Sequence, residues 1–196
     1  LKRVANSAAV AMTNVSLIEA LVDAKEEAVR AKDAIIFAMA SLAEARDNET
    51  GNHIHRTQYY VQALAEAASA AYPEQLDQRT VDLLFKCAPL HDVGKVGIPD
   101  AILLKPGKLD PDEYAIMKTH PQHGYDMLLE GKGVGEIALD VTLHHHERPD
   151  GRGYPHGLTG EALTRVARMG AVCDVYDAIT SNRPYKSGWD PAESIA

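Results

Sequence analysis

Apolar residues recur at helical spacing along most of the chain, and alternating strand patterns are absent. Residues 7–46 contain neither proline nor glycine and predict one long helix. Further helices are expected at 52–72, 78–90, 134–145 and 160–180. The sequence Asp110-Pro111-Asp112-Glu113 is typical of a helix start, and we expect that helix to carry His120. Loops rich in glycine and proline are expected at 94–107 and 150–157. The pattern predicts an all-α fold.

Two lines of apolar residues repeat every seven positions in the long helix. One line is Val15, Val22, Val29 and Ile36, and the other is Leu21, Ala28, Ile35 and Leu42. Such repeats are typical of a helix that packs along its length, as in a parallel dimer. Lys25 and Lys32 occupy the other core-type position and weaken the pattern. A linker helix that packs on its own domain explains the repeats equally well, so both alternatives stay open.

Composition narrows the class of protein. The 196 residues carry a formal charge of −8, which argues against binding to a nucleic-acid polymer. No apolar run is long enough to span a membrane, and the two cysteines, Cys87 and Cys173, lie in apolar stretches typical of a reduced core. We therefore expect a cytoplasmic protein. The chain begins at Leu1 without a signal pattern, and we expect it to be part of a longer protein.

Histidines and carboxylates recur in three distinctive segments, HDVGKVGIP (91–99), HHERPDGRGYP (145–155) and DVYDAITSNRPY (174–185). Glu49 and His53 share a helix face if a helix begins near residue 48, and His91-Asp92 follows an apolar helix. A carboxylate with two oxygens, such as that of Asp92, can bridge two metals. Imidazole and carboxylate together are the ligands of a hydrolytic metal site. These segments therefore predict a metal-dependent phosphohydrolase.

Burial strengthens this interpretation at two places. Val141 and Leu143 predict a buried helix end just before His145-His146, where histidines without partners would be unfavourable. Asp174 falls on the apolar stripe of its helix, as does Asp177. A carboxylate on a buried stripe needs a cation or several donors. The alternative for Asp174 is a buried ion pair with an arginine of the same helix.

These motifs resemble the HD-GYP family of the HD phosphohydrolases. His91-Asp92 matches the HD pair, Gly153-Tyr154-Pro155 matches the GYP triplet, and the segments 49–57 and 174–186 match the flanking motifs. The resemblance covers roughly residues 45–190. It implies an HD-domain helical bundle over 46–196, preceded by a linker or signalling helix over 1–45. This helix looks like the end of a GAF-type sensor domain, and an upstream receiver domain is the other arrangement common in the family. It also implies that the domain is incomplete at its C-terminal end.

The resemblance implies hydrolysis of cyclic di-GMP to linear pGpG, and further to GMP if a third metal assists. The implied metal ligands are Glu49, His53, His91, Asp92, His120, His145, His146 and Asp174, holding two or three divalent ions, iron or manganese. Asp92 and Lys95 are the implied catalytic residues. The implied substrate contacts are Lys95, Asp177, Arg183 and Lys186.

Other readings compete with this one. The substrate could be another cyclic dinucleotide, such as cyclic GMP-AMP, or the chain could be a non-catalytic signalling module. The family also implies a contact between the GYP loop and a diguanylate-cyclase domain, beside the homodimer that the long helix suggests. Pro149 stands where the family more often has an aromatic residue, which affects the loop but removes no ligand.

Overall fold

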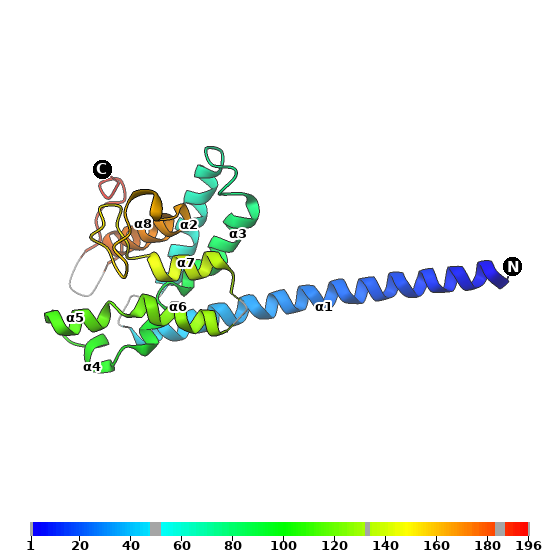
Figure 1. Ribbon diagram of the computed structural model, residues 1–196, viewed down its shortest axis with the longest axis horizontal. Helices are drawn as coiled ribbons and strands as arrows, with labels where there is room; N and C mark the ends of the chain where they lie inside the picture. The colour runs from blue at the N-terminus through cyan, green and yellow to red at the C-terminus, as the bar shows by residue number, and fades with distance from the viewer. Residues whose placement is uncertain (1, 48–51, 132–133, 183–186, 196) are drawn as a thin grey trace. The chain divides into compact units, whose positions relative to one another are not determined.

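The computed structural model describes residues 2–47, 52–131, 134–182 and 187–195 (Figure 1). In these ranges the regular secondary structure is helical, and the one isolated bridge, between Asp150 and Thr159, belongs to no strand. The all-α prediction is therefore confirmed. The chain divides into two units, Leu1–Ile35 and the compact Ile36–Ala196. None of the helices in the described ranges combines the length and apolarity that crossing a membrane requires.

The first helix, α1 (Lys2–Arg46), follows the uninterrupted helical pattern of its sequence. In its last three turns Ile36, Ala40 and Ala43 are buried, and Ile36 belongs to a core cluster with Leu90 and Leu128. Packing on its own domain therefore occurs over this end of the helix. In the unit Leu1–Ile35 the large apolar side chains of the helix are exposed instead.

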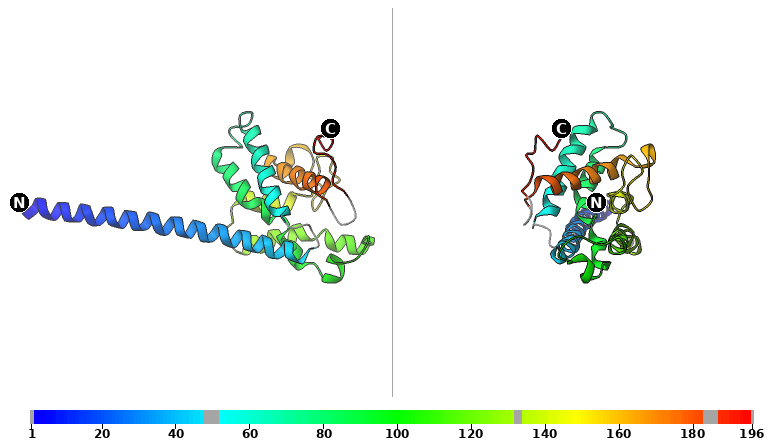
Figure 2. Two further views of the ribbon diagram at one scale, coloured as in Figure 1. Left: turned by 180° about the vertical axis from the view of Figure 1, so that it is seen from behind. Right: turned by 90° about the vertical axis from the view of Figure 1, so that its left-hand side faces the viewer.

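Four helices build the main core of the compact unit. They are α2 (His53–Ser69), α3 (Gln78–Cys87), α7 (Glu136–His144) and α8 (Arg165–Thr180). α2 packs against α3 and α8, while α7 contacts α3, α8 and α6 (His120–Glu130) (Figure 2). The core side chains are Val61, Ala65, Leu76, Val81, Leu84, Ala88, Val141, Met169 and Cys173. Cys87 and Cys173 are buried, as expected of core cysteines.

The segment expected to be a single helix carrying His120 is two helices. α5 (Pro111–Met117) begins at the expected capping box, with Asp110 as N-cap, and ends before His120, which opens α6. Pro121 accounts for the break, because proline lacks the N–H that would continue the helix by bonding to the carbonyl of Met117. His120 therefore stands at a helix start instead of on a helix face.

The segment 94–107, expected to be loop, also contains helical turns. They are the 3₁₀ helix η2 (Val93–Gly97) and the short helix α4 (Asp100–Leu103), and they follow another 3₁₀ turn, η1 (Ala88–Leu90). Gly94 allows η2 to approach α6 closely, because a Cβ at this position would lie 1.9 Å from the carbonyl oxygen of His120. Pro99 misled the prediction, since it is the N-cap of α4, a position that tolerates proline. A third 3₁₀ turn, η3 (Gly160–Ala162), precedes α8.

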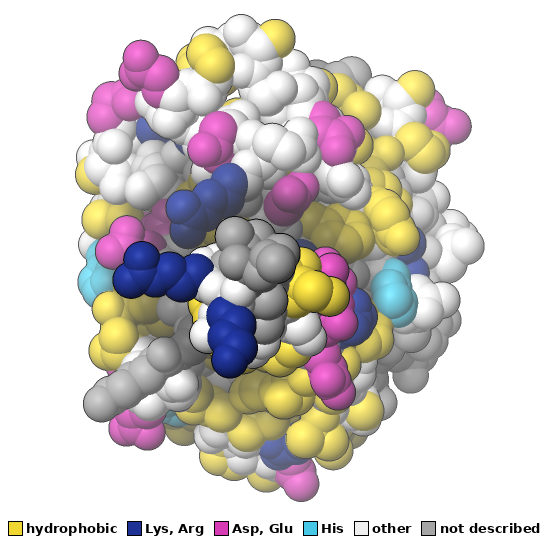
Figure 3. All heavy atoms as spheres, turned by 90° about the vertical axis from the view of Figure 1, so that its right-hand side faces the viewer, with side chains coloured by type: hydrophobic (Ala, Val, Ile, Leu, Met, Phe, Trp, Pro, Cys, Tyr) yellow, Lys and Arg dark blue, Asp and Glu magenta, His cyan; other side chains and the backbone are white. Residues whose placement is uncertain are grey.

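Charges are mixed on the surface. On the face shown in Figure 3, acidic and basic side chains are interspersed among apolar ones and form no broad basic patch among the described residues. The described residues of this face do not form the basic stripe that binds a nucleic-acid backbone. The net charge of −8 argues in the same direction.

Candidate metal centre

Five histidines and an aspartate meet inside the compact unit. Each lies at the start or end of a helix or in the turn that follows, so the packing of the helices fixes its place. The converging residues are His53, His91, Asp92, His120, His145 and His146. They form two overlapping groups, in each of which the ligand atoms lie within 4.8 Å of one another. Asp92 belongs to both groups, which is the arrangement of a bridging carboxylate.

Asp174 lies beside one of these groups. Its Oδ1 is 3.5 Å from Nε2 of His53 and 3.8 Å from Nε2 of His91. The alternative of an ion pair with Arg165 or Arg168 is not what the structure shows, because Arg165 bonds to Gln75 and Arg168 bonds to backbone carbonyls and approaches Glu161.

Backbone carbonyls orient three of the histidines. Nδ1 of His91 lies 2.8 Å from the carbonyl oxygen of Ala88. His120 and His145 repeat the arrangement with the residue three positions earlier, each at 2.9 Å. A carbonyl only accepts, so each Nδ1 carries the hydrogen. In the neutral ring Nε2 is then left with a lone pair, as metal ligation requires.

A carboxylate orients the fourth histidine. Nδ1 of His53 donates to Asp177 Oδ2 at 2.7 Å, and Arg56 donates to both oxygens of Asp177 at 2.6 and 2.9 Å. Burial raises the pKa of Asp177, but the hydrogen bonds from His53 and Arg56 outweigh burial and lower this pKa to about 2. A carboxylate behind a histidine fixes its tautomer and makes it a stronger ligand.

The shared carboxylate lacks the partner that a divalent metal would supply. Oδ1 of Asp92 is buried and accepts no hydrogen bond from the described residues. It lies 3.2 Å from Nε2 of His120 and 3.5 Å from Nε2 of His145. Nε2 of His120 and Nε2 of His145 are themselves only 3.2 Å apart. Several acceptors facing one another need a cation between them, so these residues fit a metal.

The charges of the site also favour a cation. Burial lowers the pKa of His91, yet the carboxylates of Asp92 and Asp174 outweigh burial and raise this pKa to about 9. Burial likewise opposes ionisation of Asp92, but the charges of Lys95 and His91 hold its pKa well below the usual range. Burial lowers the pKa of His146 to about 2, which keeps this ring neutral. The centre therefore combines an ionised carboxylate with a neutral imidazole.

The loop after the second group is tied to a buried carboxylate. Glu147 accepts the backbone N–H groups of His156, Gly157 and Leu158 at 2.6, 3.0 and 2.9 Å. Gly153 passes so close to this turn that a Cβ would lie 2.4 Å from the Cα of Glu147. Tyr154 stacks on the ring of His146, with centroids 4.7 Å apart. The GYP triplet therefore contacts His146, one of the expected metal ligands, directly.

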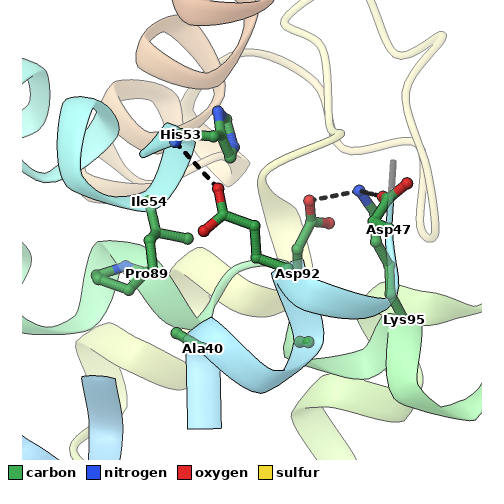
Figure 4. Close-up of a pocket in the computed structure, with 9 residues that line it drawn as sticks. Ala40, Asp47, His53, Ile54, Pro89, Asp92 and Lys95 are labelled. Carbon is green, nitrogen blue, oxygen red and sulfur yellow. Dashed lines mark hydrogen bonds and ion pairs between the residues drawn. The ribbon is translucent and has the colours of Figure 1, made fainter. Parts of the chain in front are cut away.

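A small cavity borders the shared carboxylate of Asp92. Its lining includes Glu44, Asp47, His53, Asp92 and Lys95 (Figure 4). Nζ of Lys95 lies 2.7 Å from Asp92 Oδ2 and 2.8 Å from Asp47 Oδ2. The lysine therefore contacts the carboxylate that the two groups share.

The structure brings together seven of the eight expected metal ligands. The eighth, Glu49, and the expected substrate contacts Arg183 and Lys186 lie outside the described residues. Asp177, which is also expected to contact the substrate, is buried and bonded to His53 and Arg56. It therefore holds the ring of His53, and its contact with a substrate stays a prediction.

Sequence reasoning missed four charged residues around the centre. They are Glu44, Asp47, Arg56 and Glu147. Only Glu147 left a usable signal, as the third residue of the histidine motif. Asp47 and Arg56 bond to partners 48 and 121 positions away, which no local pattern reveals, and Glu44 accepts a backbone N–H nine positions away, beyond the end of its own helix.

Comparison with known proteins agrees with this geometry. The HD domain family matches residues 22–196. A cyclic di-GMP phosphodiesterase of Vibrio cholerae is 46% identical over 95% of this chain and 40% of its own length. One from Pseudomonas aeruginosa is 46% identical over 81% of this chain and 37% of its own length. A 3′3′-cGAMP-specific phosphodiesterase of Vibrio cholerae is 40% identical over 79% of this chain and 29% of its own length.

The chain spans less than half the length of these relatives, while the match to the family covers most of the chain. The matched residues include the His91-Asp92 pair and the loop that carries Tyr154. The chain therefore belongs to the HD domain family, as the HD-GYP resemblance of its motifs predicts.

Proposed function

We propose that this chain hydrolyses a phosphodiester bond of cyclic di-GMP. The observation that carries the proposal is Asp92, shared by two groups of histidines that suit adjacent divalent metals. Relatives of 46% identity whose names state this activity support the choice of substrate. The proposed product is linear pGpG, with GMP as the product of a second cleavage.

The ligands proposed for the metals are His53, His91, Asp92, His120, His145, His146 and Asp174, with Glu49 for a third ion. Bound divalent metals supply an activated water and neutralise charge on phosphoryl oxygens. Iron or manganese is the proposed identity, since imidazole and carboxylate ligands suit either.

The residues of the chain contribute position and charge. The backbone carbonyls and Asp177 hold the histidine rings so that each Nε2 faces the centre. Lys95 adds a positive charge beside Asp92, where the substrate phosphate would lie. Arg183 and Lys186 stay proposed phosphate contacts, outside the described residues.

The test combines metal content with turnover. Protein purified under reducing, oxygen-poor conditions should hold two or three iron or manganese ions and cleave cyclic di-GMP. Asp92→Ala should lose metal and activity together. Full turnover in this variant would exclude the proposal, and metal without turnover in the unchanged protein would exclude the substrate.

A second candidate substrate is cyclic GMP-AMP, because a relative of 40% identity is named for it. A panel with both dinucleotides at equal concentration decides between them through kcat/KM. A kcat/KM ratio above about tenfold, equivalent to about 1.4 kcal/mol, would identify the preferred dinucleotide.

We also propose that residues 1–45 act as a signalling helix for the catalytic domain over 46–196. The helix would form a parallel homodimer through Leu21, Ala28, Ile35 and Leu42. The large side chains of this line are 60–65% exposed, whereas Ile36 of the other line is already used by the core. The second seam position is then Leu17, Ala24, Ala31 and Ala38, at alternating spacings of three and four.

Charge supports the parallel arrangement. With Ala28 on the seam, Glu27 and Lys32 flank it at the positions that pair across parallel helices. Ala28→Cys should therefore form a disulfide-linked dimer under oxidation, and Glu26→Cys, on the opposite face, should not. Cys87 and Cys173 are buried, so they leave the readout clear. Equal crosslinking of both variants would exclude this seam.

Two proposals remain, one on a protein partner and one on the cellular location. The GYP loop, fixed by Glu147, is the proposed contact for a diguanylate-cyclase domain, and the cytoplasm is the proposed location. A pull-down of a purified cyclase domain, with the loop variant Arg152→Glu as comparison, tests the first. Fractionation of cells tests the second.

A further inference from the structure

The last turn of α1 places two carboxylates against the metal centre. Glu44 accepts the backbone N–H of His53 at 3.0 Å, where α2 begins without a side-chain cap from its own N-cap residue, Asn52. Asp47, three residues after Glu44 and so on the same side of the chain, contacts Lys95 at 2.8 Å. Figure 4 shows Asp47 and Asp92 on either side of the Lys95 amine. The end of the long helix therefore belongs to the site.

Lys95 is shared between two acids with different roles. Its Nζ lies 2.7 Å from Oδ2 of Asp92 and 2.8 Å from Oδ2 of Asp47. Asp92 is the carboxylate common to both metal groups, whereas Asp47 belongs to neither group. A lysine held by Asp92 alone would compete directly with the metals for this carboxylate.

The lysine and both carboxylates of this arrangement are largely shielded from solvent. The side chains of Lys95, Asp47 and Asp92 are only 13, 16 and 17% exposed. The cavity they line has a volume of about 10 Å³, roughly the space that one water molecule needs. Water therefore screens the ammonium poorly, and a metal on Asp92 would repel it. Asp47 gives the ammonium a carboxylate that the metals do not take.

We infer that Asp47 is a positioning residue for Lys95. It draws the ammonium away from Asp92, so that the metals can bind Asp92 while Lys95 stays beside the substrate phosphate. The effect on metal binding needs no substrate, and the effect on the phosphate rests on the proposed function.

A double-mutant cycle tests this inference. Asp47→Asn, Lys95→Met and the double variant are titrated with Mn²⁺ against a fluorescent chelator, and KM for cyclic di-GMP is measured on the same samples. Asp47→Asn should weaken Mn²⁺ binding and raise KM by about tenfold each, as expected for a lost charge-assisted hydrogen bond. In the Lys95→Met background the same change should have no further effect.

Two results would overturn it. An unchanged Mn²⁺ affinity in Asp47→Asn would show that Asp47 does not affect the centre. An equal loss in both backgrounds would show that Asp47 attracts the metals directly and not through Lys95. Asp47→Glu guards against a folding defect, since restoring the charge should recover most of the Mn²⁺ affinity.

Asp100→Asn is the matched control. Asp100 pairs with Arg46 at the same end of α1, and its side chain is 70% exposed and does not line the cavity. This variant should bind Mn²⁺ as the unchanged protein does. If the unchanged protein binds Mn²⁺ but leaves cyclic di-GMP intact, the proposed function fails, and the Mn²⁺ cycle still decides the role of Asp47.

Discussion

The two halves of the metal centre share Asp92 and differ in what stands behind their histidines. In one half, His53 is backed by the ionised carboxylate of Asp177, while His91 is backed by the carbonyl of Ala88. In the other half, His120 and His145 are backed by backbone carbonyls. A carboxylate adds charge and makes the ring more basic, whereas a carbonyl fixes the tautomer alone. One fold therefore tunes two neighbouring sites by the second partner of each ring.

The largest effect should come from removing what the halves share. Asp92→Ala takes a ligand from both groups and should lower metal content and kcat/KM by more than about a hundredfold. Metal analysis and turnover on one sample measure both. Asp126→Ala, at an exposed aspartate of α6, is the control and should leave both unchanged.

Removing the carboxylate charge that supports His53 should weaken metal binding in one half of the centre and not in the other. Asp177→Asn keeps the shape but removes the charge that supports His53, and it should weaken one metal site by about ten- to a hundredfold. The carbonyl-backed half should keep its affinity. Stepwise titration of metal-free protein with Mn²⁺ resolves the two events, and an equal loss at both would remove the distinction drawn here.

A third variant acts on the other half alone. Glu147→Gln weakens three hydrogen bonds to the loop that carries Tyr154, and it should lower the free energy of unfolding by about 2 kcal/mol. Urea unfolding of the metal-free protein measures this loss. The metal site of His53 should be unaffected, because Glu147 lies on the side of His146.

The contribution of the Asp177 charge to the free energy of unfolding should disappear in acid. The pKa of Asp177 is about 2 in the folded protein, below the usual value of about 3.9 for an unfolded chain. Its contribution, up to about 2 kcal/mol, is therefore present above about pH 4 and disappears as the pH falls through about 2. The difference in unfolding free energy between metal-free protein and Asp177→Asn should shrink over this range. A difference independent of pH would mean that the charge is not responsible.

The ligand histidines could be predicted because short motifs carry them. His91-Asp92 and His145-His146 lie beside apolar helices whose ends are visible in the sequence. The helix break at Pro121 and the turns in 94–107 were less visible, because proline is compatible with both a loop and a helix start. Local pattern alone did not separate these alternatives.

The partners of the ligands were beyond prediction for a different reason. Arg56 meets Asp177 across 121 positions and Asp47 meets Lys95 across 48 positions. Such pairs exist only after the helices have packed. Each partner by itself reads as an ordinary charged residue on a helix, so only the folded chain reveals its role.

The burial of Ile36, Ala40 and Ala43 has a practical consequence for chimaeric receptors. A splice placed at residue 46, where the histidine motifs begin, would strip three side chains from the core and detach Glu44 from α2. A foreign input helix should therefore be joined before Ile36. Joining it in multiples of seven residues keeps the side of the helix that the foreign segment presents to within about 20° per heptad.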